Sequence, residues 1–336
     1  MRKKGTRAVL PLLILLSVTA FVWGMCWGRY EISVRDFMLV LYSKVADIPV
    51  TWSKNTENAV WVIRFPRLCA AFLVGAALSV SGATYQGIFQ NPLVSPDLLG
   101  VSAGACVGAS IAILQGWPSS VIQLVALGGG LLAVAMTILL PKFFRNKSNM
   151  MLVLSGIIVS GFFSSMQGLL KYVADPDTQL AQITFWTMGS LSKVFAGDVL
   201  SVAAPMLLCL LVLYAFRWQI NLLSLGETEA RSLGVNVPLF RGVAILCATV
   251  LTACSICISG TIGWIGLVMP HLGRMLVGAD NKRLIPVSIF LGGTFLMLID
   301  NLARNLTGSE IPLSILSGFL GTPIYALLLL RQRNNV

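Results

Sequence analysis

The sequence is poor in charge, and above all in acidic charge. Asp and Glu together number 13 of 336 residues, a single histidine is present, and charged residues make up 11% of the chain. Ordinary soluble domains contain about 25% charged residues. So few charged side chains cannot cover the surface of a soluble protein of this length, and one histidine excludes a multi-histidine metal site. The composition therefore excludes a soluble enzyme, a disordered chain and a secreted disulfide scaffold.

Three further absences narrow the function. No Gly-Lys pair occurs, so the chain has no Walker A loop for ATP. Cys254 and Cys257 have the spacing of a redox or zinc pair, but no neighbouring residue completes a site, and most of the seven cysteines lie in apolar runs. No basic run is interleaved with aromatic residues, so the net charge of +11 does not indicate nucleic-acid binding. We expect a chain that moves or gates something, with no metal or cofactor of its own.

Long uncharged stretches are what the sequence has instead. Apolar residues make up 56% of the chain, and the mean hydropathy is +0.84. One membrane crossing needs about 20 apolar residues. A turn at 116–118 and a glycine-rich stretch after Ile258 divide two of the longer runs. The pattern predicts an all-α polytopic membrane protein, one domain over residues 1–336, with ten spans at about 8–28, 64–84, 97–114, 119–140, 150–171, 197–216, 239–259, 264–278, 284–303 and 312–330.

The basic residues indicate the orientation. With ten spans, both termini lie on one side, and fifteen of the 24 Lys and Arg residues fall on that side while nine fall on the other. Basic residues are enriched on the cytoplasmic side of membrane proteins. We therefore expect both termini in the cytoplasm. The first apolar run is long and lacks a small-residue cleavage site, so we expect it to be a helix of the mature protein.

The chain also shows signs of an internal repeat. A shift of 178 positions places Ser81-Gly82 on Ser259-Gly260, Pro92 on Pro270 and Gly100 on Gly278. The predicted halves, about 60–171 and 238–330, begin on helices that run in opposite directions. An inverted repeat of this kind is typical of transporters.

Ionisable residues inside the predicted spans are few, namely His271, Arg274 and Asp300. Such residues are the default functional candidates in a membrane, although a hydrogen-bonded helix end explains them as well. Asp300 is the only carboxylate among them and lies near the end of its span. This placement argues against a proton-coupled secondary transporter, which stays as the alternative from a different class. A purely structural membrane scaffold is a weaker alternative.

One predicted cytoplasmic segment, residues 221–236, has the pattern of short amphipathic helices. Leu222, Leu225 and Leu233 could share one face, Glu227 and Glu229 fall early in a helical turn, and Gly234 supplies a stop. Such an element suits docking to a cytoplasmic partner, and an ordinary interfacial loop explains it equally well.

Several motifs resemble the FecCD family of ABC transporter permeases. They follow in the family's order along residues 10 to 330: Arg64-Phe-Pro-Arg67, Val74 to Gly82, Gln90-Asn-Pro-Leu-Val-Ser-Pro-Asp-Leu-Leu-Gly100, Leu225 to Gly234, Ser259 to Arg274, and Glu310-Ile-Pro-Leu with Gly318 and Gly321-Thr-Pro323. The resemblance implies ten helices per subunit, two permease subunits in the bacterial inner membrane, two ATP-binding subunits and an external substrate-binding protein. We expect the two permease subunits to be copies of this chain in a homodimer, with a heterodimer as the alternative. ATP would then be used by the partner.

The resemblance also implies site residues. The outer arginines would receive acidic residues of the binding protein, although lipid anchoring is an alternative; they are Arg64, Arg67 and Arg304. The ATPase-coupling residues would be Leu225, Gly226, Glu227, Glu229, Ala230, Arg231 and Gly234. A cytoplasmic gate would be formed by Asn91, Leu93, Asn149 and Met150, for which helix-end packing is the alternative. His271 would be structural.

The cargo is the least determined feature of the sequence. The family imports iron chelates, haem and vitamin B12, and we expect a ferric siderophore, with vitamin B12 or haem as the alternatives. Specificity in such systems lies mostly in the external binding protein, so this chain does not name its cargo.

Overall fold

A computed structural model of the chain describes residues 5–46, 49–144 and 148–333, and every regular element in these ranges is helical. Ten helices coincide with the ten predicted spans: α1 (Gly5–Cys26), α4 (Phe65–Ile88), α5 (Val101–Leu114), α6 (Ser119–Phe143), α7 (Asn149–Val173), α9 (Ala196–Ala215), α12 (Val237–Ser259), α13 (Ile265–Val277), α14 (Asn281–Asn305) and α15 (Leu313–Arg333). The all-α fold is therefore confirmed. Among the basic residues used for orientation, Arg2, Lys3, Lys4, Arg145 and Lys147 lie outside the described residues.

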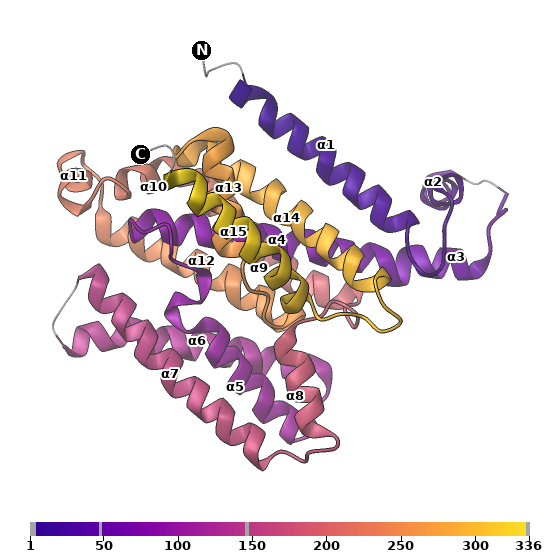
Figure 1. Cartoon of the computed structure of the whole chain (residues 1–336), viewed down its shortest axis with the longest axis horizontal. Helices are drawn as coiled ribbons and strands as arrows, with labels where there is room; N and C mark the ends of the chain where they lie inside the picture. The colour runs from indigo at the N-terminus through magenta and orange to yellow at the C-terminus, as the bar shows by residue number, and fades with distance from the viewer. Residues whose placement is uncertain (1–4, 47–48, 145–147, 334–336) are drawn as a thin grey trace.

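Length and composition separate these ten helices into two groups. Seven of the described helices are long and apolar enough to cross a membrane, and α5, α13 and α15 are shorter apolar helices. Five shorter helices join them: α2 (Val34–Tyr42), α3 (Lys54–Asn58), α8 (Gln179–Met188), α10 (Arg217–Leu223) and α11 (Glu227–Ser232). Figure 1 places α10 and α11 at one end of the bundle and α2 and α3 at the opposite end, here named the α11 end and the α2 end.

The second predicted span is longer than the sequence pattern indicated. Helix α3, the π-helix η1 (Ala59–Arg64) and α4 follow one another without a break, which gives a continuous helical stretch of 35 residues, Lys54–Ile88. The prediction began at residue 64 because Lys54 and Glu57 made the preceding residues look like a loop. A π-turn inside a longer helix often marks a functional position.

Helices α4, α12 and α14 form the centre of the bundle. The buried share of the apolar stretch is 83% in α4, 78% in α12 and 67% in α14, against 22–33% in α1, α6, α7 and α9. Glycines let the central helices approach closely, since a methyl group at Gly75 would lie 2.2 Å from the Gly292 carbonyl oxygen. One at Gly82 would lie 1.7 Å from the Gly266 carbonyl oxygen. Small residues at such crossings are typical of helix packing in membranes.

The predicted helix breaks are confirmed. Helix α12 ends at Ser259, Gly260 has a φ of 68°, and α13 begins five residues later. Gly116, at the predicted turn between α5 and α6, has a φ of 67°. A third break follows α4, where the chain turns through the short 3-10 helix η2 (Pro96–Leu99) before α5 begins.

Candidate functional site

At the α2 end, one arginine holds two carboxylates. Arg67 lies in the first turn of α4, and its Nε donates to both carboxylate oxygens of Asp300 on α14 at 3.0 Å. Its two terminal nitrogens donate to the two oxygens of Glu310, before α15, at 2.8 and 2.9 Å. The guanidinium therefore uses both its Nε–H and its two terminal nitrogens in charge-assisted contacts, the strong form of this interaction.

The other two predicted docking arginines are also engaged within the chain. Arg304 follows Asp300 by one helical turn, and its Nε lies 3.4 Å from an Asp300 oxygen. Arg304 also donates to Asn301 and to the Gly24 carbonyl. Arg64 donates to the main-chain carbonyls of Met25 and Tyr30.

Burial gives these arginines a structural role. Their exposed fractions are 5% for Arg64, 4% for Arg67 and 9% for Arg304, and Asp300 is fully buried. Glu310, with 35% of its side chain exposed, is the member of the cluster that faces outward. The sequence pointed to the arginines and to Asp300 separately; the four-residue spacing of Asp300 and Arg304 on one helix was the signal for their pairing. Docking of a partner at these arginines remains a prediction.

The predicted coupling segment, residues 221–236, forms the last turn of α10, all of α11 and the turns beside them at the α11 end. Gly226, with a φ of 123°, precedes α11, and Gly234, with a φ of 79°, follows it. Ala230 is buried, and its N–H donates to the Gly226 carbonyl at 3.0 Å. Leu225 and Leu233 are exposed, so they leave an apolar surface beside the helix.

Glu227 links this segment to α12. Its carboxylate accepts hydrogen bonds from Arg231, one turn later in α11, and from Arg241 on α12. Partial burial alone would raise the pKa of Glu227, but the two arginines outweigh it and the pKa lies below its usual value. Glu227 is thus ionised and holds α11 against the start of α12.

The predicted gate residues lie at the same end of the bundle. Leu93 and Met150 are exposed, and the side chain of Asn91 accepts a hydrogen bond from the Leu93 N–H at 2.9 Å. Asn149 opens α7, and its side chain lies outside the described residues. A constriction formed by these four residues remains a prediction.

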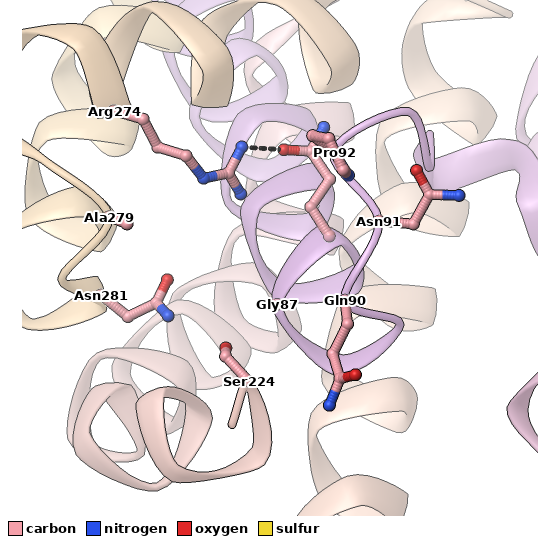
Figure 2. Close-up of a pocket in the computed structure, with 9 residues that line it drawn as sticks. Gly87, Gln90, Asn91, Pro92, Ser224, Arg274, Ala279 and Asn281 are labelled. Carbon is pink, nitrogen blue, oxygen red and sulfur yellow. Dashed lines mark hydrogen bonds between the residues drawn. The ribbon is translucent and has the colours of Figure 1, made fainter. Parts of the chain in front are cut away.

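Beside the gate residues lies a pocket that the sequence did not indicate (Figure 2). Its volume is about 140 Å³, and it is lined by Gln86, Gly87, Gln90, Asn91, Pro92, Ser224, Arg274, Ala279 and Asn281. Arg274 on α13 donates to Gln86 Oε1, and Gln86 Nε2 donates to the Val94 carbonyl at 3.1 Å. Gln90 Nε2 donates to the Leu223 carbonyl at 3.3 Å. The pocket therefore lies between the end of α4, the loop of residues 89–95, here named the gate loop, and the coupling segment.

The remaining polar candidates are buried. His271 packs edge-on against Tyr325 with ring centres 5.7 Å apart, and its ring nitrogens have no hydrogen-bond partner among the described residues. Cys254 and Cys257 are buried in α12, where the Cys257 thiol donates to the Cys254 carbonyl at 3.2 Å. Within the described ranges, no group of three or more His, Cys, Asp or Glu side chains could hold a metal ion.

Ten apolar helices, with their polar groups gathered at the two ends, define a multi-pass membrane protein of the permease class. Residues 13–331 match the model of the FecCD transport family, and the chain belongs to that family as an ABC transporter permease. It is 38% identical to the molybdate import system permease protein MolB of Haemophilus influenzae, over 96% of this chain and 95% of that protein. It is 40% identical to the hemin transport system permease protein HmuU of Yersinia pestis, over 97% and 96%.

A solved structure agrees with this assignment. It is described as an inward-facing conformation of a metal-chelate type ABC transporter, and it superimposes with a TM-score of 0.87 at 37% identity. The match covers 97% of this chain and 99% of the other. The family match and the structural match therefore agree on the class of protein and on the overall arrangement of its helices.

Proposed function

We propose that this chain is the permease subunit of an ATP-driven importer whose cargo is a ferric chelate of the siderophore type. The observation that carries the proposal is the match over nearly the whole chain to a transporter of the metal-chelate type. Relatives named as iron chelatin permeases from Helicobacter pylori, 41% and 40% identical over 81% of this chain, favour iron. Haem and vitamin B12 are the nearest alternatives, because relatives bear those names as well.

A second candidate cargo is molybdate. A relative named for molybdate import matches 96% of this chain at 38% identity. An oxyanion differs from a chelate in size and in charge, so uptake assays separate the two candidates directly.

Uptake of labelled cargo tests the assignment. Cells that depend on this permease would be offered radioactive iron in a siderophore, iron in haem, labelled vitamin B12 and labelled molybdate, with a strain lacking the permease as the control. We expect permease-dependent uptake of the siderophore-bound iron. Uptake of molybdate alone would replace the ferric chelate by the second candidate, and uptake by purified permease without any ATPase would favour a proton-coupled carrier.

The complex would contain two copies of this permease, two cytoplasmic ATP-binding subunits and one extracytoplasmic binding protein in the inner membrane, with both permease termini in the cytoplasm. Exposed Leu225 and Leu233 support docking of the ATPase at α11, because they leave apolar side chains uncovered beside a charged helix. ATP would bind the partner, since this sequence has no Walker A loop. Native mass spectrometry of the purified assembly would report this stoichiometry directly.

Coupling through α11 can be tested at Ala230. Proline at this position removes the N–H that donates to the Gly226 carbonyl, and its ring conflicts with the preceding turn. We expect Ala230→Pro to remain in the membrane but to lose ATPase association, or the stimulation of ATP hydrolysis by the loaded binding protein. Ala230→Ser keeps the N–H and serves as the control. Normal stimulation in the proline variant would place coupling elsewhere.

Docking at the α2 end would involve the position that Glu310 occupies. We propose that a carboxylate of the binding protein approaches Arg67 from outside, where Glu310 is the exposed member of the cluster. Reversing Arg67 to Glu would gather three carboxylates and would not separate docking from folding. Glu310→Gln instead weakens the internal competitor, so we expect tighter and more salt-sensitive association. Glu57→Gln, in an exposed pair with Lys44, is the matched control; unchanged affinity in Glu310→Gln would leave Arg67 a purely internal residue.

A further inference from the structure

The pocket at the α11 end contains a cation without a carboxylate partner. Arg274 donates one hydrogen bond to the neutral side chain of Gln86, and the ion pairs found among the described residues do not include Arg274. A guanidinium has five N–H donors. Figure 2 shows the Arg274 side chain reaching into the pocket from α13, with Asn281 and Ser224 on the facing wall. An anion is the ligand that this charge would attract.

The same pocket holds a buried acceptor that lacks a donor. Asn281 is 3% exposed, and its Oδ1 accepts no hydrogen bond from any described residue. The residue is held in place through its main-chain N–H, which donates to Asn221 Oδ1 at 2.7 Å. A buried unsatisfied acceptor costs about 1–3 kcal/mol, so a ligand that donates a hydrogen bond there gains affinity. An occupant that brings both negative oxygens and a hydroxyl would satisfy both groups.

Size and backbone geometry restrict the occupant further. Pockets for drug-sized molecules measure about 300–1,000 Å³, whereas this one measures about 140 Å³ and admits only a few heavy atoms. Gln90 on its wall has a φ of 53°, an uncommon conformation for a residue other than glycine. Its side chain is tied to the coupling segment through the Leu223 carbonyl. Strained residues of this kind gather at binding sites.

We propose that this pocket binds one hydrogenphosphate ion. The oxygens that carry the negative charge bind Arg274, and the P–OH group donates to Asn281 Oδ1. Sulfate has the same shape but no hydroxyl at neutral pH, so the pocket discriminates against it. This site is independent of the proposed transport function. Only the statement that the ion comes from the cytosol rests on the proposed orientation, which places the α11 end in the cytoplasm.

Because the pocket is formed jointly by the gate loop and the turn before α11, the bound ion contacts both. Asn91 and Pro92 belong to the loop, and Ser224 belongs to the turn. Phosphate therefore stabilises the arrangement in which these two segments lie together.

The experiment measures binding to the purified full-length permease in nanodiscs of zwitterionic phosphatidylcholine. Phosphate is titrated at pH 7 by calorimetry and by thermal unfolding, with sulfate and chloride at matched ionic strength. Sulfate also controls for the general stabilisation that both salts give at high concentration. We expect saturable phosphate binding and an affinity for sulfate at least tenfold lower. Equal affinities, or no saturable response to phosphate, would overturn the proposal.

Variants then assign the site. Arg274→Gln and Asn281→Ala should each weaken phosphate binding at least tenfold. Gly87→Ala keeps all charges and suits a helix, but its methyl group would lie 3.0 Å from Ile220 Cγ2, 3.2 Å from Ser224 Oγ and 3.7 Å from Asn281 Nδ2, so it should also reduce binding. Lys282→Gln removes a neighbouring positive charge, which lies over the Trp218 ring, and should bind like the wild type.

A final comparison separates free phosphate from a lipid headgroup. Nanodiscs that contain phosphatidylglycerol offer a phosphate diester, which has no P–OH group. We expect this lipid to leave the phosphate affinity unchanged. Competition by the lipid would show that the site binds a lipid headgroup and not free phosphate. Wild-type phosphate affinity in both single variants, Arg274→Gln and Gly87→Ala, would show that phosphate binds elsewhere.

Discussion

Arg67 lies at one end of α4 and Arg274 contacts Gln86 near its other end, and the two arginines differ in their charged partners. Arg67 at the α2 end holds two carboxylates, and Asp300 is shared with a second arginine. Arg274 at the α11 end has only the neutral Gln86 as a hydrogen-bond partner among the described residues. The first end is a closed, charge-balanced cluster, and the second is an open pocket with an unbalanced charge.

This difference separates the end of the bundle where ion pairs stabilise the fold from the end where hydrogen-bond donors remain unused and can bind a ligand. Breaking a buried ion pair by removing one partner costs about 3–5 kcal/mol, because the remaining charge stays buried. The cluster at the α2 end therefore fixes α4 to α14. The pocket contributes less to stability, and its unused donors are free for a ligand.

Removing the shared carboxylate should have the largest effect. Asp300→Ala leaves Arg304 without its ion pair and Arg67 with Glu310 alone, so we expect a loss of about 3–5 kcal/mol of stability. Thermal and denaturant unfolding in detergent would measure it. Glu57→Ala, which removes one exposed pair, should cost no more than about 1 kcal/mol. Equal losses in the two variants would mean that the cluster at the α2 end is not the tighter one.

Neutralising each arginine compares the two ends directly. Arg67→Gln leaves Glu310 facing a neutral side chain and removes one partner of Asp300, whereas Arg274→Gln removes a charge that has no carboxylate partner. We expect the first variant to be less stable than the second by about 2 kcal/mol. Unfolding measurements in phosphate-free buffer make this comparison, and a larger loss in Arg274→Gln would reverse our description of the two ends.

The smallest effect should come from Glu227 at the α11 end. Its pKa is lowered in the folded protein, against about 4.3 in an unfolded chain. The stabilisation is therefore fully present above about pH 4.3 and is lost as the pH falls through the lower folded value. Because the side chain is 43% exposed, we expect about 0.2–1 kcal/mol. The difference in unfolding midpoint between the wild type and Glu227→Gln should disappear at low pH; a constant difference would exclude an ionic origin.

Hydropathy was sufficient to predict the seven long helices, because a span must be apolar over about 20 residues whatever it packs against. The shorter α5 and α13 were separated from their neighbours by the turn at 116–118 and by the glycine-rich stretch after Ile258. The same rule explains what was missed. Helices α2 and α8 are shorter than a span, and the charged residues of α3 concealed its continuity with α4. The two predicted repeat halves contain helices of 24, 14, 25 and 25 residues and of 23, 13, 25 and 21 residues, and an inverted relation between the halves remains a prediction.

The candidate site was less predictable, because it depends on contacts between distant parts of the chain. Arg67 and Asp300 are separated by 233 positions, and Gln86 and Arg274 by 188. The resemblance identified Arg67 from its motif, but no sequence pattern indicated that its guanidinium was already occupied. Arg274 and Asn281 likewise could be assigned to one pocket only after the structure had placed α13 and α14 beside the end of α4.

The unbroken stretch from Lys54 to Ile88 is a single long helix. At about 1.5 Å per residue, its 35 residues extend for about 50 Å, beyond the roughly 30 Å of a hydrocarbon core. The π-turn of η1 lies between α3, at the α2 end, and α4. Each residue of an α-helix advances the side chains by about 100° around the axis. Loss of the extra residue in η1 would therefore rotate α3 by about 100° about the helix axis relative to α4, so this π-turn sets the direction in which the side chains of α3 point.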